Sequence, residues 1–287
     1  MVSVSTLAAI TIDGLAFGAS LALLGVGITL VYGLGEVLNL AIGAFAVIAA
    51  IAASLLVSDG VALPVAAAAG LGLVGVFGLV IDRTLLSLVY RSDGEERILL
   101  GIFTTLGLAV MIEGVLVNFV SSRYSLPLGV SPIDVGTTVV TGTSVVTIVV
   151  AAVVLLVLFA FLNRTFLGKA TRTIFQDERG AQLVGIDPRK IRTLVFVLSA
   201  LVAGLAGLLI AARSNIGVGN AFEFTTFALI VSIVGGVRSL VGAVVAGVLL
   251  GLVNTLAGFF IGSYVATIIL FGAAIVFLLV RPEVMSS

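Results

Sequence analysis

The sequence predicts an all-α integral membrane protein, a polytopic bundle of about eight transmembrane helices. Of its 287 residues, 61% are hydrophobic and only 10% are charged, whereas a soluble domain carries roughly 25% charged residues. The charged residues are clustered, so several charge-free stretches reach the roughly 20 residues that a helix needs to cross a bilayer. These stretches are apolar all round, whereas the strands of a membrane barrel alternate apolar and polar residues. Helices are therefore expected.

Eight apolar stretches are expected as membrane elements. In chain order they lie at about 10–31, 37–58, 61–82, 97–120, 143–163, 193–212, 222–260 and 264–281. The seventh is interrupted by Gly235-Gly236 and Arg238-Ser239, so we expect a broken segment with parts at 222–235 and 240–260. Together the elements are expected to form a single transmembrane domain, 1–287.

The placement of Lys and Arg predicts orientation, because cytoplasmic loops carry an excess of basic residues. Seven of the 14 basic residues lie in the segment 164–192, which is expected to be cytoplasmic. The loop at 121–141 has a single arginine and is expected to be external. If Arg281 also marks the cytoplasmic side, then 222–260 must enter and leave the membrane from outside as a re-entrant pair. The alternative stays open that 240–260 crosses fully and leaves the C-terminus outside.

The composition excludes several classes of function. A net charge of zero gives no indication of a nucleic-acid partner. Without Cys there is no disulfide and no thiolate metal site, and without His the commonest metal ligand and general base is missing. The chain also has no P-loop motif, because Gly168-Lys169 lacks both the upstream Gly and the following hydroxyl residue. We expect no catalytic residue, metal or cofactor in this chain, and any ATP to be hydrolysed on another subunit.

The polar segment 164–192 has a helical pattern of its own. Four apolar residues can share one stripe with charges on the other face: Ala170, Ile174, Ala181 and Val184. Gly185 is well placed as a C-cap, and Pro188 prevents continuation of the helix. Two interpretations stay open: a solvated loop that sets orientation, or a short amphipathic helix that docks a soluble partner at the cytoplasmic face.

Three blocks resemble the permeases of branched-chain amino acid ABC transporters, of the LivH type. The first runs from Gly168 to Pro188 and continues into the Ala203–Leu209 stretch. The second spans Gly18 to Gly43, and the third spans Gly235 to Gly247 and ends with Arg281-Pro282. The resemblance covers nearly the whole chain and favours the smaller of the family's two permease types.

The resemblance implies a permease subunit in the plasma membrane that forms the translocation pathway for branched-chain or other hydrophobic amino acids. It also implies a complex with a second permease in a heterodimer, two cytoplasmic ATP-binding subunits and an external substrate-binding protein. The segment 164–192 would then be the coupling helix that receives the ATPase stroke. Coupling residues are expected at Gly168, Lys169, Arg172, Gln176, Asp177, Ala181, Gly185 and Ile186.

Broken helices and polar groups at membrane depth indicate where a solute path could lie. Helix ends around Gly33–Gly43 and Gly235–Ser239 can offer dipoles to a zwitterionic head group without fixed charge. Glu113 is the clearest ionisable residue inside an expected span. The expected pathway residues are Tyr32, Gly33, Asn39, Ile42, Gly43, Glu113, Gly235, Gly236 and Ser239. Ile42 stands where the family usually has His, which leaves the solute open.

Two other functions stay open. An ion-gradient-driven secondary transporter would need no partner and could use Glu113 for ion coupling. A permease of the same family could instead carry urea or short amides. Dependence on ATP rather than on an ion gradient separates the first of these from an ABC importer.

Overall fold

The computed structural model describes the chain except for residues 1–3, 36, 93, 121–122, 136–137 and 281–287. Its α-helices are α1 (Val4–Gly35), α2 (Ile42–Ser58), α3 (Leu63–Ile81), α4 (Ser87–Val89), α5 (Gly94–Phe119), α6 (Gly142–Arg164), α7 (Phe166–Gln176), α8 (Glu178–Leu183), α9 (Pro188–Ala211), α10 (Asn220–Gly235), α11 (Leu240–Ile261) and α12 (Ser263–Val280). A π-helical turn, η1 (Asp82–Leu86), joins α3 to α4. Strands β1 (Ile133–Val135) and β2 (Thr138–Val140) form a small antiparallel hairpin.

The prediction of a polytopic helical membrane protein is confirmed. Within the described residues, six helical stretches are long and apolar enough to cross a membrane: α1, α3 with η1 and α4, α5, α6, α9 and α11. Three further apolar helices, α2, α10 and α12, are shorter. The expected number was about eight because the broken segment 222–260 was counted as one element.

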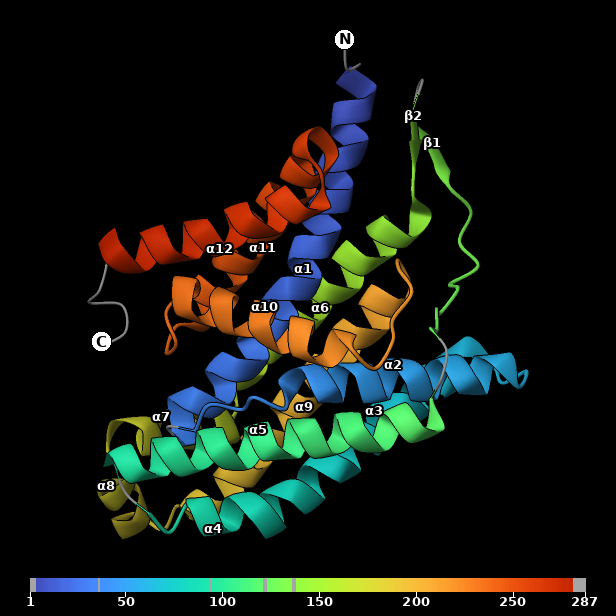
Figure 1. Cartoon of the computed structure of the whole chain (residues 1–287). Helices are drawn as coiled ribbons and strands as arrows, with labels where there is room; N and C mark the ends of the chain where they lie inside the picture. Colours follow the sequence, from blue (N-terminus) through green and yellow to red (C-terminus); the bar gives the residue numbers. More distant parts are fainter. Residues whose placement is uncertain (1–3, 36, 93, 121–122, 136–137, 281–287) are drawn as a thin grey trace.

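The centre of the bundle is α1, which is buried without interruption from Gly18 to Val31 and packs against α6, α9, α10 and α11 (Figure 1). Small residues bring α1 and α11 together. A Cβ at Gly18 would lie 2.8 Å from the Cα of Val248, and one at Gly247 would lie 2.5 Å from the Cα of Ala22. Helices in lipid associate through such close backbone contacts, because burial of apolar surface does not by itself favour association there.

The segment 222–260 breaks where the sequence predicted. Helix α10 ends at Gly235, and Gly236 has a φ of +91°, in the left-handed region that favours glycine. Helix α11 then runs back beside α10. The turn lies at the same end of the bundle as α7 and α8 (Figure 1). At 1.5 Å per residue, α10 is about 24 Å long and α11 about 33 Å, so the pair extends deep into the bundle. Whether it is re-entrant stays a prediction, and Arg281 lies outside the described residues.

Several expected boundaries were wrong: α1 covers Val4–Gly35 rather than about 10–31, and α9 begins at Pro188 rather than at 193. The second element was expected to begin at residue 37, but α2 begins at Ile42. The intervening Val37–Ala41 is a non-helical connector with Val37, Asn39 and Ala41 buried. Hydropathy could not reveal this stretch, because its residues are apolar enough to extend the following helix, and hydroxyl groups from distant helices satisfy its backbone instead.

Candidate functional site

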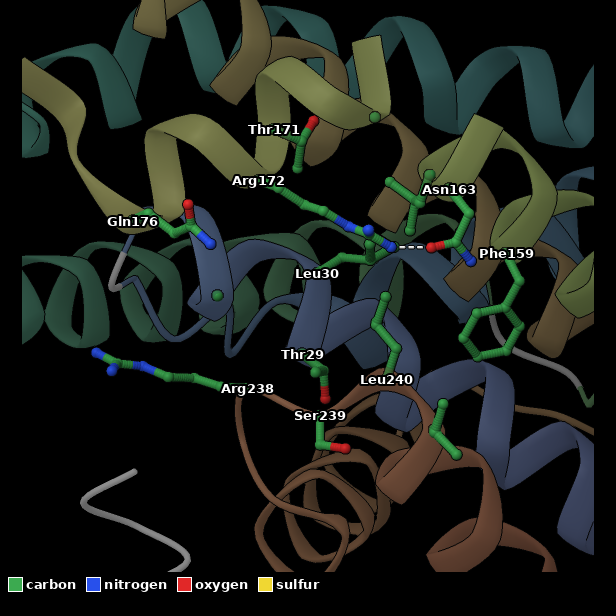
Figure 2. Close-up of a pocket in the computed structure, with 14 residues that line it drawn as sticks. Thr29, Leu30, Phe159, Asn163, Thr171, Arg172, Gln176, Arg238, Ser239 and Leu240 are labelled. Atoms are coloured by element: carbon green, nitrogen blue, oxygen red, sulfur yellow. Dashed lines mark hydrogen bonds between the residues drawn. The ribbon is translucent and has the colours of Figure 1, made fainter. Parts of the chain in front are cut away.

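A cavity of about 410 Å³ lies between α1, α6, α7 and the α10–α11 turn (Figure 2). Apolar side chains such as Leu30 and Phe159 form part of its wall. Its polar lining includes Arg172 and Gln176 of α7 and Ser239 of the turn. The described lining contains no carboxylate. Its charged lining residues are Arg172 and Arg238, which lie beside polar and apolar side chains.

The start of α7 is fixed by a cap and by a glycine. The backbone of Thr165 is extended, and its hydroxyl accepts a hydrogen bond from the amide of Gly168 at 3.1 Å, as an N-cap residue does. A Cβ at Gly168 would overlap with the carbonyl of Leu162. Gly168 therefore allows α7 to fold back closely against the end of α6.

The exposed charged face of α7 borders the cavity. The guanidinium of Arg172 donates to the side-chain oxygen of Asn163 on α6, and Figure 2 shows this pair reaching across the cavity above Leu30. Lys169 and Gln176 are also exposed. These positions leave α7 available for contact with another protein, but their role in coupling stays a prediction.

The expected single stripe over 170–184 was partly wrong. Ala170, Ile174 and Ala181 are buried, but Val184 is 71% exposed. The reason is Asp177, whose extended backbone (φ −155°, ψ 103°) divides the segment into α7 and α8 and changes the direction of the chain. Sequence periodicity could not detect this break, because the spacing continues across it.

The end of α8 confirms the expected C-cap. Gly185 has a φ of +83°. Its amide donates to the carbonyl of Gln182, and the amide of Ile186 donates to that of Ala181, both at 3.0 Å. These two bonds form a Schellman motif. The motif leaves Leu183, which is 89% exposed, and Val184 at the tip of the segment.

An ion-pair cluster joins α8 to the bundle, and sequence analysis did not identify it. The carboxylate of Glu178 accepts from the guanidinium of Arg192 on α9 at 2.6 Å and lies 4.0 Å from that of Arg97 on α5. Arg192 is only 7% exposed, and its guanidinium carbon lies 4.8 Å from the centre of the Tyr90 ring. Burial raises the pKa of the Tyr90 phenol above its usual 10, so the ring stays neutral at physiological pH.

Two buried threonines hold the connector between α1 and α2, and sequence analysis missed both. The Thr105 hydroxyl of α5 accepts from the amide of Leu40 at 3.0 Å and donates to the carbonyl of Leu38 at 2.9 Å. The Thr225 hydroxyl of α10 donates to the carbonyl of Leu40 and accepts from the amide of Gly43, both at 3.1 Å. These bonds satisfy buried backbone groups that would otherwise be costly. No sequence spacing links threonines to a connector so distant in the chain.

The predicted residues of the connector have clear structural surroundings. Ile42 is fully enclosed, and a Cβ at Gly43 would overlap with the carbonyl of Ala221 at the start of α10. Asn39 is also fully buried: its oxygen accepts from the amide of Ala41 at 3.1 Å, while its Nδ2 has no partner among the described residues. Of these predicted residues, Asn39 alone offers an unsatisfied polar group.

The other predicted residues fall into separate places. Gly33 and Ser239 line the same cavity as Gly168, Arg172 and Gln176, so part of the pathway set lies beside part of the coupling set. Partly buried Tyr32 precedes Gly33 on α1.

The two glycines of the turn have different structural reasons. A Cβ at Gly235 would overlap with backbone atoms of Ala243, and Gly236 has the left-handed φ. Glu113 lies partly buried on α5 and is not among the residues that line the cavity. The pathway roles stay predictions.

The comparisons with known proteins agree with one another and cover almost the whole chain. The family described as "Branched-chain amino acid transport system / permease component" matches residues 10–279. The chain is 29% identical to the high-affinity branched-chain amino acid transport system permease protein BraD of Pseudomonas aeruginosa, over 94% of this chain and 92% of BraD. It is 26% identical to LivH of Escherichia coli K12, over the same shares. LivM of E. coli is 34% identical over 37% of this chain and 26% of its own length.

Proposed function

We propose that this chain, which belongs to the family of branched-chain amino acid transport system permease components, forms the membrane pathway of an ABC importer for branched-chain or other hydrophobic amino acids. The observation that carries the proposal is the family match over residues 10–279. BraD and LivH, which match 94% of the chain, are both named as permease proteins of high-affinity branched-chain amino acid transport systems. The solute itself would undergo no chemical change.

The segment 164–192 would receive the ATPase stroke. Its tip carries two adjacent exposed apolar side chains, Leu183 and Val184, which on a cytoplasmic surface favour docking of a partner. From α8, the bond between Glu178 and Arg192 would pass displacement to α9. From α7, the wall of the cavity would pass it to the α10–α11 turn. The segment could thus act on both sides of the bundle.

Helix α10 would transmit movement of the α10–α11 turn to the solute path. Near its start, Thr225 is hydrogen-bonded to the α1–α2 connector, and its end leads into the Gly235-Gly236 turn. A movement of the turn would therefore pull on the connector, where Asn39 Nδ2 has no partner within the described part of the chain. Asn39 is as enclosed as Ile42, so its amide would meet a zwitterionic solute only after such a movement. Because Ile42 is enclosed, its departure from the usual His would affect packing more directly than solute contact.

The importer would be completed by other subunits in the plasma membrane. We expect a second, LivM-like permease in a heterodimer, two cytoplasmic ATP-binding subunits that hydrolyse the ATP, and an external substrate-binding protein. The match to LivM over part of the chain supports two related permeases with a common origin.

Affinity isolation of the tagged chain from its native membranes tests this assembly. Mass spectrometry should identify a P-loop ATPase and a second permease. Leu183→Asp should reduce recovery of the ATPase at least tenfold and leave the second permease bound, whereas Gln182→Asp, an exposed neighbour on α8, should retain both. Recovery of this chain alone, in a detergent that keeps a known ABC importer intact, would instead support a gradient-driven transporter.

A further inference from the structure

A second, larger groove lies between α3 and α9, which pack against each other. Its volume is about 840 Å³. Along its length it is lined by apolar and small residues, among them Gly72, Val76 and Leu79 of α3 and Leu194 and Val197 of α9. A Cβ at Gly72 would meet no atom within 4 Å, so this side of the groove is open.

The lining of the groove is basic rather than apolar at one end. Three basic residues line it there, Arg83 beyond α3 and Arg189 and Lys190 in the first turn of α9. All three are exposed. Lys190 lies 3.6 Å from Asp187, and the Asp82 carboxylate interacts with both Arg83 and Arg189, so three basic residues face two carboxylates at this end. This end belongs to the basic segments that are expected to face the cytoplasm.

We infer that this groove binds an anionic phospholipid with a hydroxylated headgroup, of the phosphatidylglycerol type. The apolar length lies on two membrane-spanning stretches, where an acyl chain can fill it and water is disfavoured. The arginines at its end can bind a phosphate through paired charge-assisted hydrogen bonds. Basic pockets between transmembrane helices on the cytoplasmic side bind anionic headgroups in this way.

An adjoining cavity of about 210 Å³ gives the headgroup a defined site, because Arg189 lines both spaces. Two buried side chains there have unused hydrogen-bonding atoms among the described residues: Arg192 Nε, a donor, and Asp82 Oδ1, an acceptor. A phosphate oxygen can accept from the first, and a glycerol hydroxyl can donate to the second. A choline headgroup has no hydroxyl to donate. The cavity therefore favours the glycerol headgroup.

Lipid retained by the complete complex tests the inference. The complex is extracted in mild detergent, incubated with phosphatidylglycerol or phosphatidylcholine, and analysed by native mass spectrometry. Wild type should retain phosphatidylglycerol in preference to phosphatidylcholine. Arg83→Ala and Arg189→Ala should each weaken retention roughly fivefold, since a basic residue near a headgroup contributes about that factor. Arg164→Ala, an exposed arginine at the end of α6 and outside the groove, should retain the lipid.

A second pair of variants tests the acyl part. Gly72→Leu should fill the groove and abolish retention without a clash, whereas Gly107→Leu on α5, also exposed with nothing within 4 Å of its Cβ position, should retain the lipid. Equal retention of the two lipids by wild type, or unchanged retention in all three groove variants (Arg83→Ala, Arg189→Ala and Gly72→Leu), would overturn the inference. So would displacement of the lipid by inorganic phosphate alone, which would indicate a site for a free anion.

Discussion

At the residue scale, buried hydroxyl groups take over hydrogen bonds that a membrane helix normally makes within itself. The connector Val37–Ala41 gives up helical bonding inside an apolar bundle, and Thr105 and Thr225 replace part of it. Non-helical backbone is tolerated at membrane depth only with such partners. The two threonines therefore allow α1 and α2 to be separated by an irregular stretch that contains the buried Asn39.

Replacement of Thr225 by valine should destabilise the protein. The change keeps the shape of the side chain but leaves the amide of Gly43 and the carbonyl of Leu40 without this partner, at a cost of about 1–3 kcal/mol for each unsatisfied group. Thermal unfolding in detergent, followed by size-exclusion chromatography of a fluorescent fusion, measures the effect. Thr226→Val is the matched control, because Thr226 is only partly buried and its hydroxyl donates to the carbonyl of Phe222 in its own helix. Equal melting temperatures for the two variants would contradict the role of Thr225.

At the element scale, α8 is a short helix whose position depends on its contacts with other elements. An isolated helix of six residues is not stable in water. Its Schellman motif closes one end, and Glu178 attaches the other to Arg192. The pair is partly buried, so removal of Glu178 takes away the carboxylate that binds Arg192 directly and leaves the more distant Asp82. We therefore expect this pair to hold α8 against α9.

Glu178→Ala should uncouple transport from ATP hydrolysis. With α8 detached from α9, the complex should still assemble and hydrolyse ATP, but solute uptake per ATP should fall at least tenfold. Both rates are measured on the same reconstituted complex. Arg179→Ala, an exposed neighbour on α8, should leave the ratio unchanged. Parallel loss of both activities in Glu178→Ala would show that the residue only maintains the fold.

The sequence predicted elements well where a single helix determines them. Long apolar runs located the spans, Gly235-Gly236 located a break, and Gly185 located a C-cap, because each depends on local hydropathy or backbone conformation. The break at Asp177 and the late start of α2 at Ile42 were missed. The connector before α2 depends on contacts with distant helices, which a one-dimensional pattern does not contain. Among the candidate site residues, the sequence could not predict that Gly33 would lie beside Arg172.

At the scale of the whole molecule, the structure places several predicted segments at one end. The α10–α11 turn lies at the end that holds α7 and α8 (Figure 1), and the basic segment 164–192 predicts that this end is cytoplasmic. The β1–β2 hairpin and the expected external loop lie towards the opposite end. The α10–α11 turn would then be accessible from the cytoplasm. This position is notable because α10, with 16 residues, is one of the shorter apolar helices.

Single cysteines can test this orientation, because the chain has no cysteine of its own. A membrane-impermeant maleimide applied from outside should label Ser131→Cys, in the external loop, and should not label Gln182→Cys on α8. Arg238→Cys, in the exposed part of the α10–α11 turn, should behave like Gln182→Cys. Labelling of Arg238→Cys from outside would show instead that the turn is a shallow re-entrant structure open to the external side.

If this chain is the permease of an ATP-driven importer, reconstituted proteoliposomes that contain it should take up labelled leucine. The complex isolated with its partners is supplied with substrate-binding protein on one side and ATP on the other. Uptake should require ATP and should persist when ionophores collapse all ion gradients. Excess unlabelled isoleucine or valine should compete, while urea and acetamide should not. Uptake by this chain alone, driven by an ion gradient and independent of ATP, would contradict its assignment to an ATP-driven importer.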